Sequence, residues 1–206
     1  MKNKIRFLMI VMGLFTCCAI VSAQTTTAIN GTPYMDETYV TGVVYFANRS
    51  QTAPIRYNVF QDLVEYQQNG KALVLDPNAT IKKVHFGTAV LIPQKYESNG
   101  NPKFGYFAVL DSGKVTLLAK KKVIFLAAKK GGALDGSDQP AEYKRSADTF
   151  YYKIGDGEVQ EVESIKSMIA SFPDKQEELS QFAKKEKISP RKEKELIQFV
   201  QYYNSL

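Results

Sequence analysis

The chain has 206 residues, of which 44% are hydrophobic and 23% are charged, with a formal net charge of +6 and two cysteines. This length suffices for one domain, or for one domain with a small appendage. Three of the 27 basic residues lie in the first 23 positions, where no acidic residue occurs, so the rest of the chain is only mildly basic and nucleic acid is not an expected partner.

The first 23 residues have the three parts of a secretory signal peptide. Lys2, Lys4 and Arg6 form a positive start, Phe7–Ile20 is an unbroken apolar run, and Val21–Ala23 is a small-residue cleavage pattern. An apolar run of about 14 residues is shorter than the roughly 20 that a membrane-spanning helix needs. We therefore expect cleavage after residue 23, a periplasmic or secreted protein, and no transmembrane segment in the mature chain.

Both cysteines, Cys17 and Cys18, lie inside the predicted signal peptide. A lipoprotein anchored through one of them is a less favoured alternative, because Leu14–Thr16 precedes them where lipoprotein processing requires a small residue. After cleavage the mature chain has no cysteine, which excludes disulfides, thiolate metal sites and cysteine nucleophiles.

Residues 24–38 are small and polar and predict a flexible leader, and residues 39–163 predict a β domain. This region alternates β-branched and aromatic runs with Gly, Asn, Asp and Pro, as short strands do. The expected strands are Tyr39–Phe46, Ile55–Phe60, Leu63–Gln67, Lys71–Leu75, Ile81–Phe86, Thr88–Ile92, Phe104–Leu110, Lys114–Leu118, Val123–Leu126, Thr149–Ile154 and Glu158–Val162.

The turns between these strands are predicted from their residue types. Asn69-Gly70 accepts the positive φ angles of a type I′ hairpin turn. Asp111–Gly113 and Gly155–Gly157 predict two further hairpins, and residues 97–103 a loop. The stretch from 129 to 145 is rich in Gly, Asp, Lys and Ala and predicts a mobile loop.

After residue 163 the apolar period changes from two to about 3.6, which predicts helices over residues 164–206. Ser164 can cap a first helix that ends at Pro173, and Asp174 with Glu177 resembles a capping box for a second. Ser189-Pro190 predicts the start of a third helix, and the apolar positions at that spacing are Leu196, Ile197, Val200 and Tyr203. The expected fold class is therefore α+β: an antiparallel meander, as a twisted sheet or partly closed barrel, followed by a helical appendage packed on it.

Three stretches of the chain resemble a group of uncharacterised exported proteins of Bacteroidetes-type bacteria. They are Gly31–Tyr34, then Pro54–Asn58 with Asp62 and Glu65, and the ending with Glu195–Ile197 and Tyr202–Asn204. The resemblance implies bacterial export; it implies no activity, cofactor or site residue.

Few residues offer catalytic chemistry. The single histidine, His85, stands in an alternating strand, and no Gly-x-Ser-x-Gly elbow exposes a nucleophile. Carboxylate pairs, as in glycoside hydrolysis, are the remaining acid–base groups, and the candidates are Asp62, Glu65, Asp148, Asp156 and Glu158. Turns also collect Asp for conformational reasons, so we predict no catalytic residue, no metal site and no cofactor.

Two groups of residues are candidates for ligand binding. Arg56 with Tyr57 has the composition that grips planar or anionic groups, although an alternating strand explains both residues as well. Lys120, Lys121 and Lys122, followed by Lys129-Lys130, could contact anionic lipid; the alternative is that edge lysines prevent strands of different molecules from pairing.

The favoured hypothesis is an exported, non-enzymatic accessory or binding protein of the cell envelope, whose partner is a protein, lipid or glycan. One alternative is a carboxylate-dependent enzyme similar to glycoside hydrolases. The other is a peripheral binder of anionic lipid that uses the lysine cluster.

Overall fold

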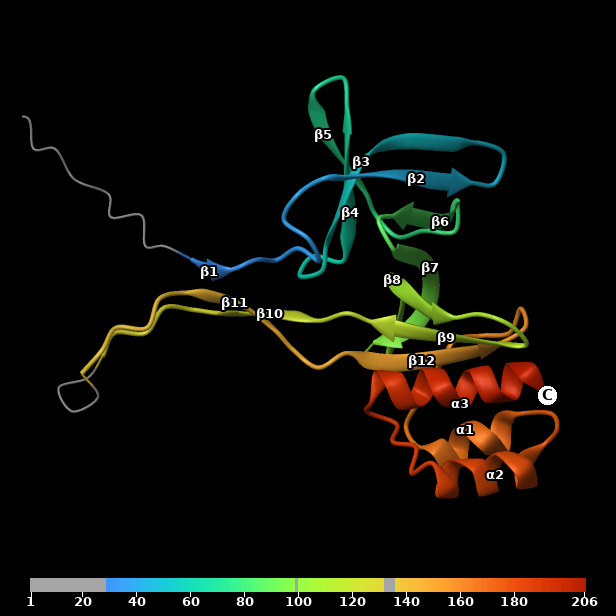
Figure 1. Cartoon of the computed structure of the whole chain (residues 1–206). Helices are drawn as coiled ribbons and strands as arrows, with labels where there is room; N and C mark the ends of the chain where they lie inside the picture. Colours follow the sequence, from blue (N-terminus) through green and yellow to red (C-terminus); the bar gives the residue numbers. More distant parts are fainter. Residues whose placement is uncertain (1–28, 99, 132–135) are drawn as a thin grey trace, which may run out of the picture.

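The computed structural model describes residues 29–98, 100–131 and 136–206, so the predicted signal peptide and both cysteines lie outside the described residues. The described chain forms a ten-stranded antiparallel sheet, a three-stranded sheet and three helices (Figure 1). The predicted α+β class is confirmed. Of its two expected forms the open sheet is the one found, because the large sheet does not close into a barrel.

The large sheet consists of two meanders that meet at a single seam. Its strand order is β13-β12-β9-β8-β7-β6-β2-β3-β4-β5, so β6 pairs with β2 after the β2–β5 meander is complete. The strands are β2 (Val40–Phe46), β3 (Ser50–Asn58), β4 (Leu63–Gln68), β5 (Lys71–Leu75), β6 (Ile81–Phe86), β7 (Ala89–Ser98), β8 (Asn101–Asp111), β9 (Val115–Lys120), β12 (Thr149–Ile154) and β13 (Gln160–Glu161).

Hairpin turns set the register of both meanders. Asn69 (φ 51°) and Gly70 (φ 73°) join the paired residues Gln68 and Lys71, as predicted for a type I′ turn. The loop predicted over residues 97–103 is wrong in extent. There the β7–β8 hairpin pairs up to Ser98 opposite Asn101, because backbone hydrogen bonds continue the ladder where the side-chain pattern no longer alternates.

The sheet is apolar on both faces at the end that carries β8, β9 and β12. Neighbouring side chains of a strand point to opposite faces, yet consecutive residues such as Leu117 and Leu118 are both fully buried. One face belongs to the main core, which continues under β2–β4. The other face holds a small cluster of Phe107, Leu118 and Tyr151.

The three helices cover the main-core face at this end: α1 (Ile165–Ser171), α2 (Gln176–Lys185) and α3 (Glu193–Ser205) (Figure 1). The Oγ of Ser164 accepts a hydrogen bond from the Ser167 N–H at 3.0 Å, as expected for the cap of α1. Helix α3 packs against β8 and β9. Its buried residues are Leu196, Phe199, Val200 and Tyr203, a stripe with helical spacing.

The predicted starts of α2 and α3 are wrong, because the expected capping residues make other contacts. Asp174 does not cap α2 but accepts a hydrogen bond from the Tyr203 hydroxyl at 2.9 Å, and Lys175, with a φ of 62°, occupies the N-cap position before Gln176. Helix α3 begins at Glu193, after Pro190. The carboxylate of Glu195 instead accepts the Ser189 N–H at 2.8 Å.

A two-stranded ribbon projects from the sheet between β9 and β12 (Figure 1). It pairs β10 (Val123–Leu126) with β11 (Glu142–Arg145), and backbone hydrogen bonds of 2.8 and 2.9 Å between Lys129 and Gln139 continue it. We call residues 123–131 and 136–145 the arm. The prediction of one loop over 129–145 is therefore wrong at its C-terminal part, where backbone pairing makes a strand from a polar sequence.

The leader predicted over residues 24–38 is fixed in its described part. β1 (Asn30–Gly31) runs parallel to β11, and the Met35 N–H donates to the Tyr57 carbonyl at 2.9 Å. The guanidinium of Arg145 donates to the carbonyl of Tyr34 at 3.0 Å. These contacts correct the prediction of a flexible leader for residues 29–38.

Candidate functional site

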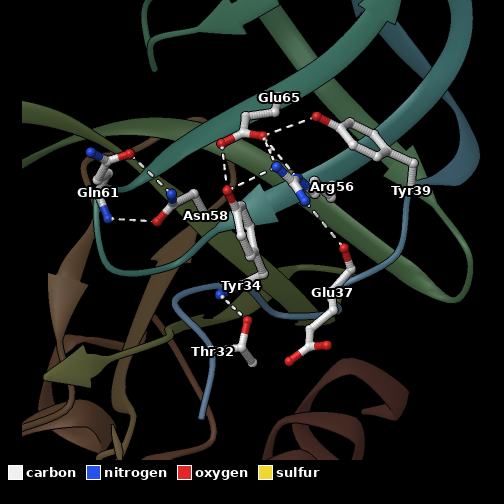
Figure 2. Close-up of polar contacts among 8 residues, drawn as sticks. All are labelled: Thr32, Tyr34, Glu37, Tyr39, Arg56, Asn58, Gln61 and Glu65. Carbon is white, nitrogen blue, oxygen red and sulfur yellow. Dashed lines mark hydrogen bonds and ion pairs between the residues drawn. The ribbon is translucent and has the colours of Figure 1, made fainter. Parts of the chain in front are cut away.

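Arg56 is the centre of a polar cluster that ties the N-terminal segment to the β3–β4 hairpin (Figure 2). Arg56 of β3 and Glu65 of β4 are direct cross-strand partners, so their side chains leave the same face of the sheet. The Arg56 Nε and one terminal nitrogen lie 2.8 and 2.7 Å from the same Glu65 oxygen. Charged hydrogen bonds of this length are among the stronger ones in proteins.

Two tyrosines complete this cluster, which we call the Arg56 pin. The hydroxyls of Tyr34 and Tyr39 donate to the two Glu65 oxygens at 3.1 and 3.0 Å (Figure 2). Arg56 also donates to the Tyr34 hydroxyl at 2.9 Å and to the Glu37 carbonyl at 3.3 Å. Its guanidinium carbon lies 3.8 and 4.4 Å from the ring centres of Tyr34 and Tyr39, within cation–π range.

The contacts of the pin stabilise the ionised forms of both Glu65 and Arg56. Burial opposes the ionisation of Glu65, but the hydrogen bonds from Arg56, Tyr39 and Tyr34 outweigh it and lower the pKa of Glu65. Burial likewise acts against the charge of Arg56, and Glu65 more than compensates, so the pKa of Arg56 is raised. Arg56, a predicted ligand-binding residue, thus uses its charge within the chain to hold the N-terminal segment.

Tyr57, the other predicted ligand-binding residue of β3, points into the core and belongs to a second cluster. Its hydroxyl donates to Asp62 at 2.7 Å, and the other Asp62 oxygen lies 2.5 Å from the Nζ of Lys120. The Lys120 Nζ also donates to the Tyr106 carbonyl at 2.9 Å, and the Tyr106 N–H donates to Asp62 at 3.2 Å. We call these four residues the Lys120 cluster.

The local backbone makes room for this ion pair. Asp62 has a φ of 58° in a turn closed by paired hydrogen bonds between Asn58 and Gln61 (Figure 2). A Cβ at the position of Gly105 would lie 2.5 Å from the Lys120 Nζ and 2.8 Å from an Asp62 oxygen, so any larger residue there would displace the ion pair.

Burial dominates the electrostatics of the Lys120 cluster. It lowers the pKa of Lys120, and the nearby Asp62 carboxylate offsets only part of this effect. Burial, together with the charge of Asp62, raises the pKa of Tyr57 and of Tyr106. Lys120 is largely but not completely buried as half of an ion pair, with its Nζ 5.0 Å from the ring centre of Phe107.

The other two predicted lysines have different surroundings. Lys121 donates to Asp148 at 2.7 Å and to Glu193 at 3.2 Å, which ties the start of α3 to the end of β9 and the start of β12. Burial opposes its charge, but these carboxylates raise the pKa of Lys121. Lys122 is exposed at the base of the arm. The three lysines thus do not form one continuous basic surface.

A groove of about 900 Å³ lies between the β7–β8 hairpin and the β12–β13 hairpin. Tyr96 and Tyr151 belong to the small aromatic cluster beneath it, with ring centres 6.0 Å apart and an edge-to-face geometry. Five carboxylates and one lysine line the groove; they are Glu97, Asp156, Glu158, Glu161, Glu163 and Lys95. We call it the tyrosine groove.

The tyrosine groove combines a rigid aromatic base with many hydrogen-bond acceptors. Phe107 packs edge-on against Tyr96 at 5.1 Å and against Tyr151 at 5.0 Å, which fixes both rings. Burial and the neighbouring Glu161 raise the pKa of Tyr151, so its hydroxyl remains a neutral donor at physiological pH. Such a surface suits ligands that carry N–H or O–H groups.

The predicted acid–base residues separate in the structure. Asp62 and Glu65 belong to the two ion-pair clusters, and Asp148 binds Lys121. Of these five candidates, Asp156 and Glu158 line the tyrosine groove. His85 is exposed on β6, and within the described residues no group of three His, Cys, Asp or Glu side chains is placed to hold a metal ion.

A second groove, of about 690 Å³, separates α1 from α2. Ile165, Ile169, Ala183 and Ile188 give it an apolar lining, with Lys166 and Glu177 beside them. Nothing in the structure shows what covers it.

Comparisons with known proteins yield no relative of this chain. No family model matches it, and neither a curated protein nor a solved structure is significantly similar. Among the helices of residues 29–98, 100–131 and 136–206, none is long and apolar enough to cross a membrane.

Sequence reasoning missed the tyrosine groove. Tyr96 and Tyr151 lie 55 positions apart. Tyr151 stands in a predicted strand that is rich in aromatic residues, and Tyr96 follows the end of the predicted strand Thr88–Ile92. Only the sheet order, which places β7, β8, β9 and β12 side by side, brings them together.

Proposed function

We propose that the protein is an exported, non-enzymatic binding protein that holds its ligand in the tyrosine groove. Export rests on the predicted signal peptide, which also favours the periplasm or the exterior as the place of action. The observation that carries the proposal is the coexistence, in one groove of about 900 Å³, of two fixed tyrosines and five carboxylates. A groove of this size is typical of ligand sites.

The chemistry of the groove favours a ligand rich in hydrogen-bond donors. Carboxylates accept hydrogen bonds from amines and hydroxyls, and tyrosine rings offer flat apolar contact to a sugar face or an alkyl chain. Amines and sugar hydroxyls share this donor chemistry. They differ in charge, so binding of an amine weakens strongly with added salt and binding of a neutral glycan does not.

The proposal is tested by native mass spectrometry of the mature protein purified from the envelope of its own cells. We expect extra mass that denaturation removes, and its fragmentation identifies the ligand as an amine or a sugar. A clean mass of the protein alone would count against the groove as a ligand site.

A pair of charge-reversal variants assigns the extra mass to the groove. Glu158 is exposed on its rim, and Glu158→Lys should reduce the bound fraction severalfold. Asp36→Lys makes the same charge change at an exposed position outside the groove and should bind as the wild type does. Equal losses in both variants would place the ligand elsewhere.

A carboxylate-dependent hydrolase is the second candidate, because Asp156 and Glu158 share the groove with two tyrosines. Binding is favoured over catalysis, since both carboxylates are exposed, whereas the general acid of a glycoside hydrolase needs a buried environment that raises its pKa. A screen of chromogenic glycosides decides between them. Turnover that disappears in both Asp156→Asn and Glu158→Gln would make the protein an enzyme.

A further inference from the structure

Exposed apolar side chains gather on the arm and at its base. The described residues include seven large hydrophobic side chains that are exposed, and four of these lie here: Ile29 (53% exposed), Phe60 (45%), Phe125 (42%) and Leu126 (42%). The ring of Tyr143 links two of them, with its centre 5.3 Å from that of Phe60 and 5.0 Å from that of Phe125. Such a concentration marks an interaction surface rather than scattered exposure.

The arm presents apolar groups on both of its faces. Phe125 is paired with Tyr143, and Leu126 with Glu142. Because successive side chains of a strand alternate, Phe125 and Leu126 point to opposite faces of the ribbon. A folded partner docked on one face would leave the other face in water. A lipid layer surrounds a thin inserted ribbon and covers both faces.

Exposed lysines accompany these apolar groups. Lys122 lies at the base of the arm, Lys144 on β11, and Lys129 and Lys130 beyond β10, and all four are exposed. In the sequence from Lys122 to Arg145, five basic residues stand against three acidic ones. Lysines next to exposed aromatic and aliphatic groups complement the phosphates of anionic lipid headgroups.

We propose that the arm inserts into the headgroup layer of an anionic lipid bilayer. Phe125, Leu126 and Ile29 enter the boundary with the acyl chains, while the lysine ammonium groups remain among the phosphates. The free edge of β10 keeps its backbone groups in the headgroup layer, where water still satisfies them. This surface is distinct from the tyrosine groove, so neither proposal depends on the other.

The test is flotation of the complete mature protein with vesicles of phosphatidylcholine, with and without phosphatidylglycerol. We expect the protein to float with vesicles that contain phosphatidylglycerol at low salt, to remain with them only partly at high salt, and to stay unbound with phosphatidylcholine alone. The absence of flotation with the anionic vesicles at low salt overturns the proposal.

Two pairs of variants locate the binding surface. Lys129→Glu with Lys130→Glu should lower the vesicle affinity about twentyfold or more, since each lysine near an anionic surface contributes roughly fivefold. Lys184→Glu with Lys185→Glu makes the same charge change on two exposed residues of α2 and should bind almost as well as the wild type. Equal losses in both double variants would indicate attraction by net charge alone and overturn the arm as the contact.

The apolar contribution is tested at matched strand positions. Leu126→Thr should weaken vesicle binding, whereas Leu73→Thr, at a leucine of β5 that is 37% exposed, should not. Threonine preserves β propensity, so both variants are expected to fold. If Leu126→Thr left vesicle binding unchanged, the arm would not contact the lipid and the proposal would fail. If the same substitution altered the oligomeric state measured by analytical ultracentrifugation without lipid, the arm would be a protein contact, and the proposal would fail as well.

Discussion

The β3–β4 hairpin takes part in two ion pairs whose electrostatics are opposite. In the Arg56 pin, two tyrosine hydroxyls and a two-point charged contact outweigh the cost of burial, so both charges are favoured. In the Lys120 cluster, burial exceeds the attraction of Asp62 and disfavours the lysine charge. The difference shows that the same kind of contact stabilises a fold or costs it energy according to its other hydrogen bonds and its depth.

The largest effect is expected from removing one charge of the Lys120 cluster. Asp62→Asn retains the shape of the side chain and tolerates the positive φ, but leaves the Lys120 charge without its partner. We expect the free energy of unfolding to fall by about 3 kcal/mol, as measured by urea denaturation.

Replacing both partners sharpens this result. Asp62→Asn combined with Lys120→Met removes the buried charge as well, and should recover a large part of the lost stability. A double variant as unstable as the sum of its single variants would contradict the view that burial of the lysine charge is the dominant cost.

Glu65→Gln removes the charge at the centre of the Arg56 pin and should lower the free energy of unfolding by about 2 kcal/mol. Urea denaturation measures the change. Glu37→Gln is the matched control, because Glu37 contributes only its backbone carbonyl to the pin. If Glu37→Gln lowered the free energy of unfolding by the same amount, the Glu65 carboxylate would not be what stabilises the Arg56 pin.

The pin also predicts a dependence of stability on pH. The folded-state pKa of Glu65 lies below its ordinary value of 4.5, so its stabilisation is complete above that value and disappears as the pH falls through the lowered pKa. The advantage of the wild type over Glu65→Gln should therefore narrow from pH 5 toward pH 2, in urea denaturation at each pH. A constant difference across this range would mean that the carboxylate charge does not matter.

The smallest of these effects belongs to Tyr39→Phe, which keeps the ring near Arg56 and removes one hydrogen bond to Glu65. We expect a loss of about 1 kcal/mol in thermal or urea denaturation. Because the hydroxyl acts through Glu65, the same substitution made in Glu65→Gln should cost less. Full additivity of the two losses would show that the tyrosine and the glutamate act separately.

Local rules predicted much of the fold, including the Asn69-Gly70 turn, the Ser164 cap and the change from strands to helices. They failed where an expected capping residue makes a different contact. Asp174 and Ser189 were expected to start helices by local capping, yet Asp174 binds Tyr203, and the Ser189 N–H donates to Glu195 ahead of a helix that begins only at Glu193. Local propensity is a weak guide once a tertiary partner competes for the same group.

The polar sites were harder to predict, for the same reason. Arg56 and Glu65 both appear in the sequence analysis, but their pairing follows from the β3–β4 register. Of the two tyrosines that join them, Tyr34 belongs to the predicted leader and Tyr39 to the start of a predicted strand. Lys120 is the last residue of β9 and Lys121 follows the strand, so the two neighbours serve different ion pairs, one with Asp62 and the other with Asp148 and Glu193. The tyrosine groove depends on strand order, which one sequence does not reveal.

The strands on either side of the arm meet as neighbours: Lys120, the last residue of β9, is the direct pairing partner of Thr149, the first residue of β12. A short hairpin turn could therefore join these two residues and leave the register of the sheet unchanged. The segment between them can therefore be replaced by segments of other lengths and chemistries. The sheet, the helices and the tyrosine groove would serve as a constant scaffold for such grafts.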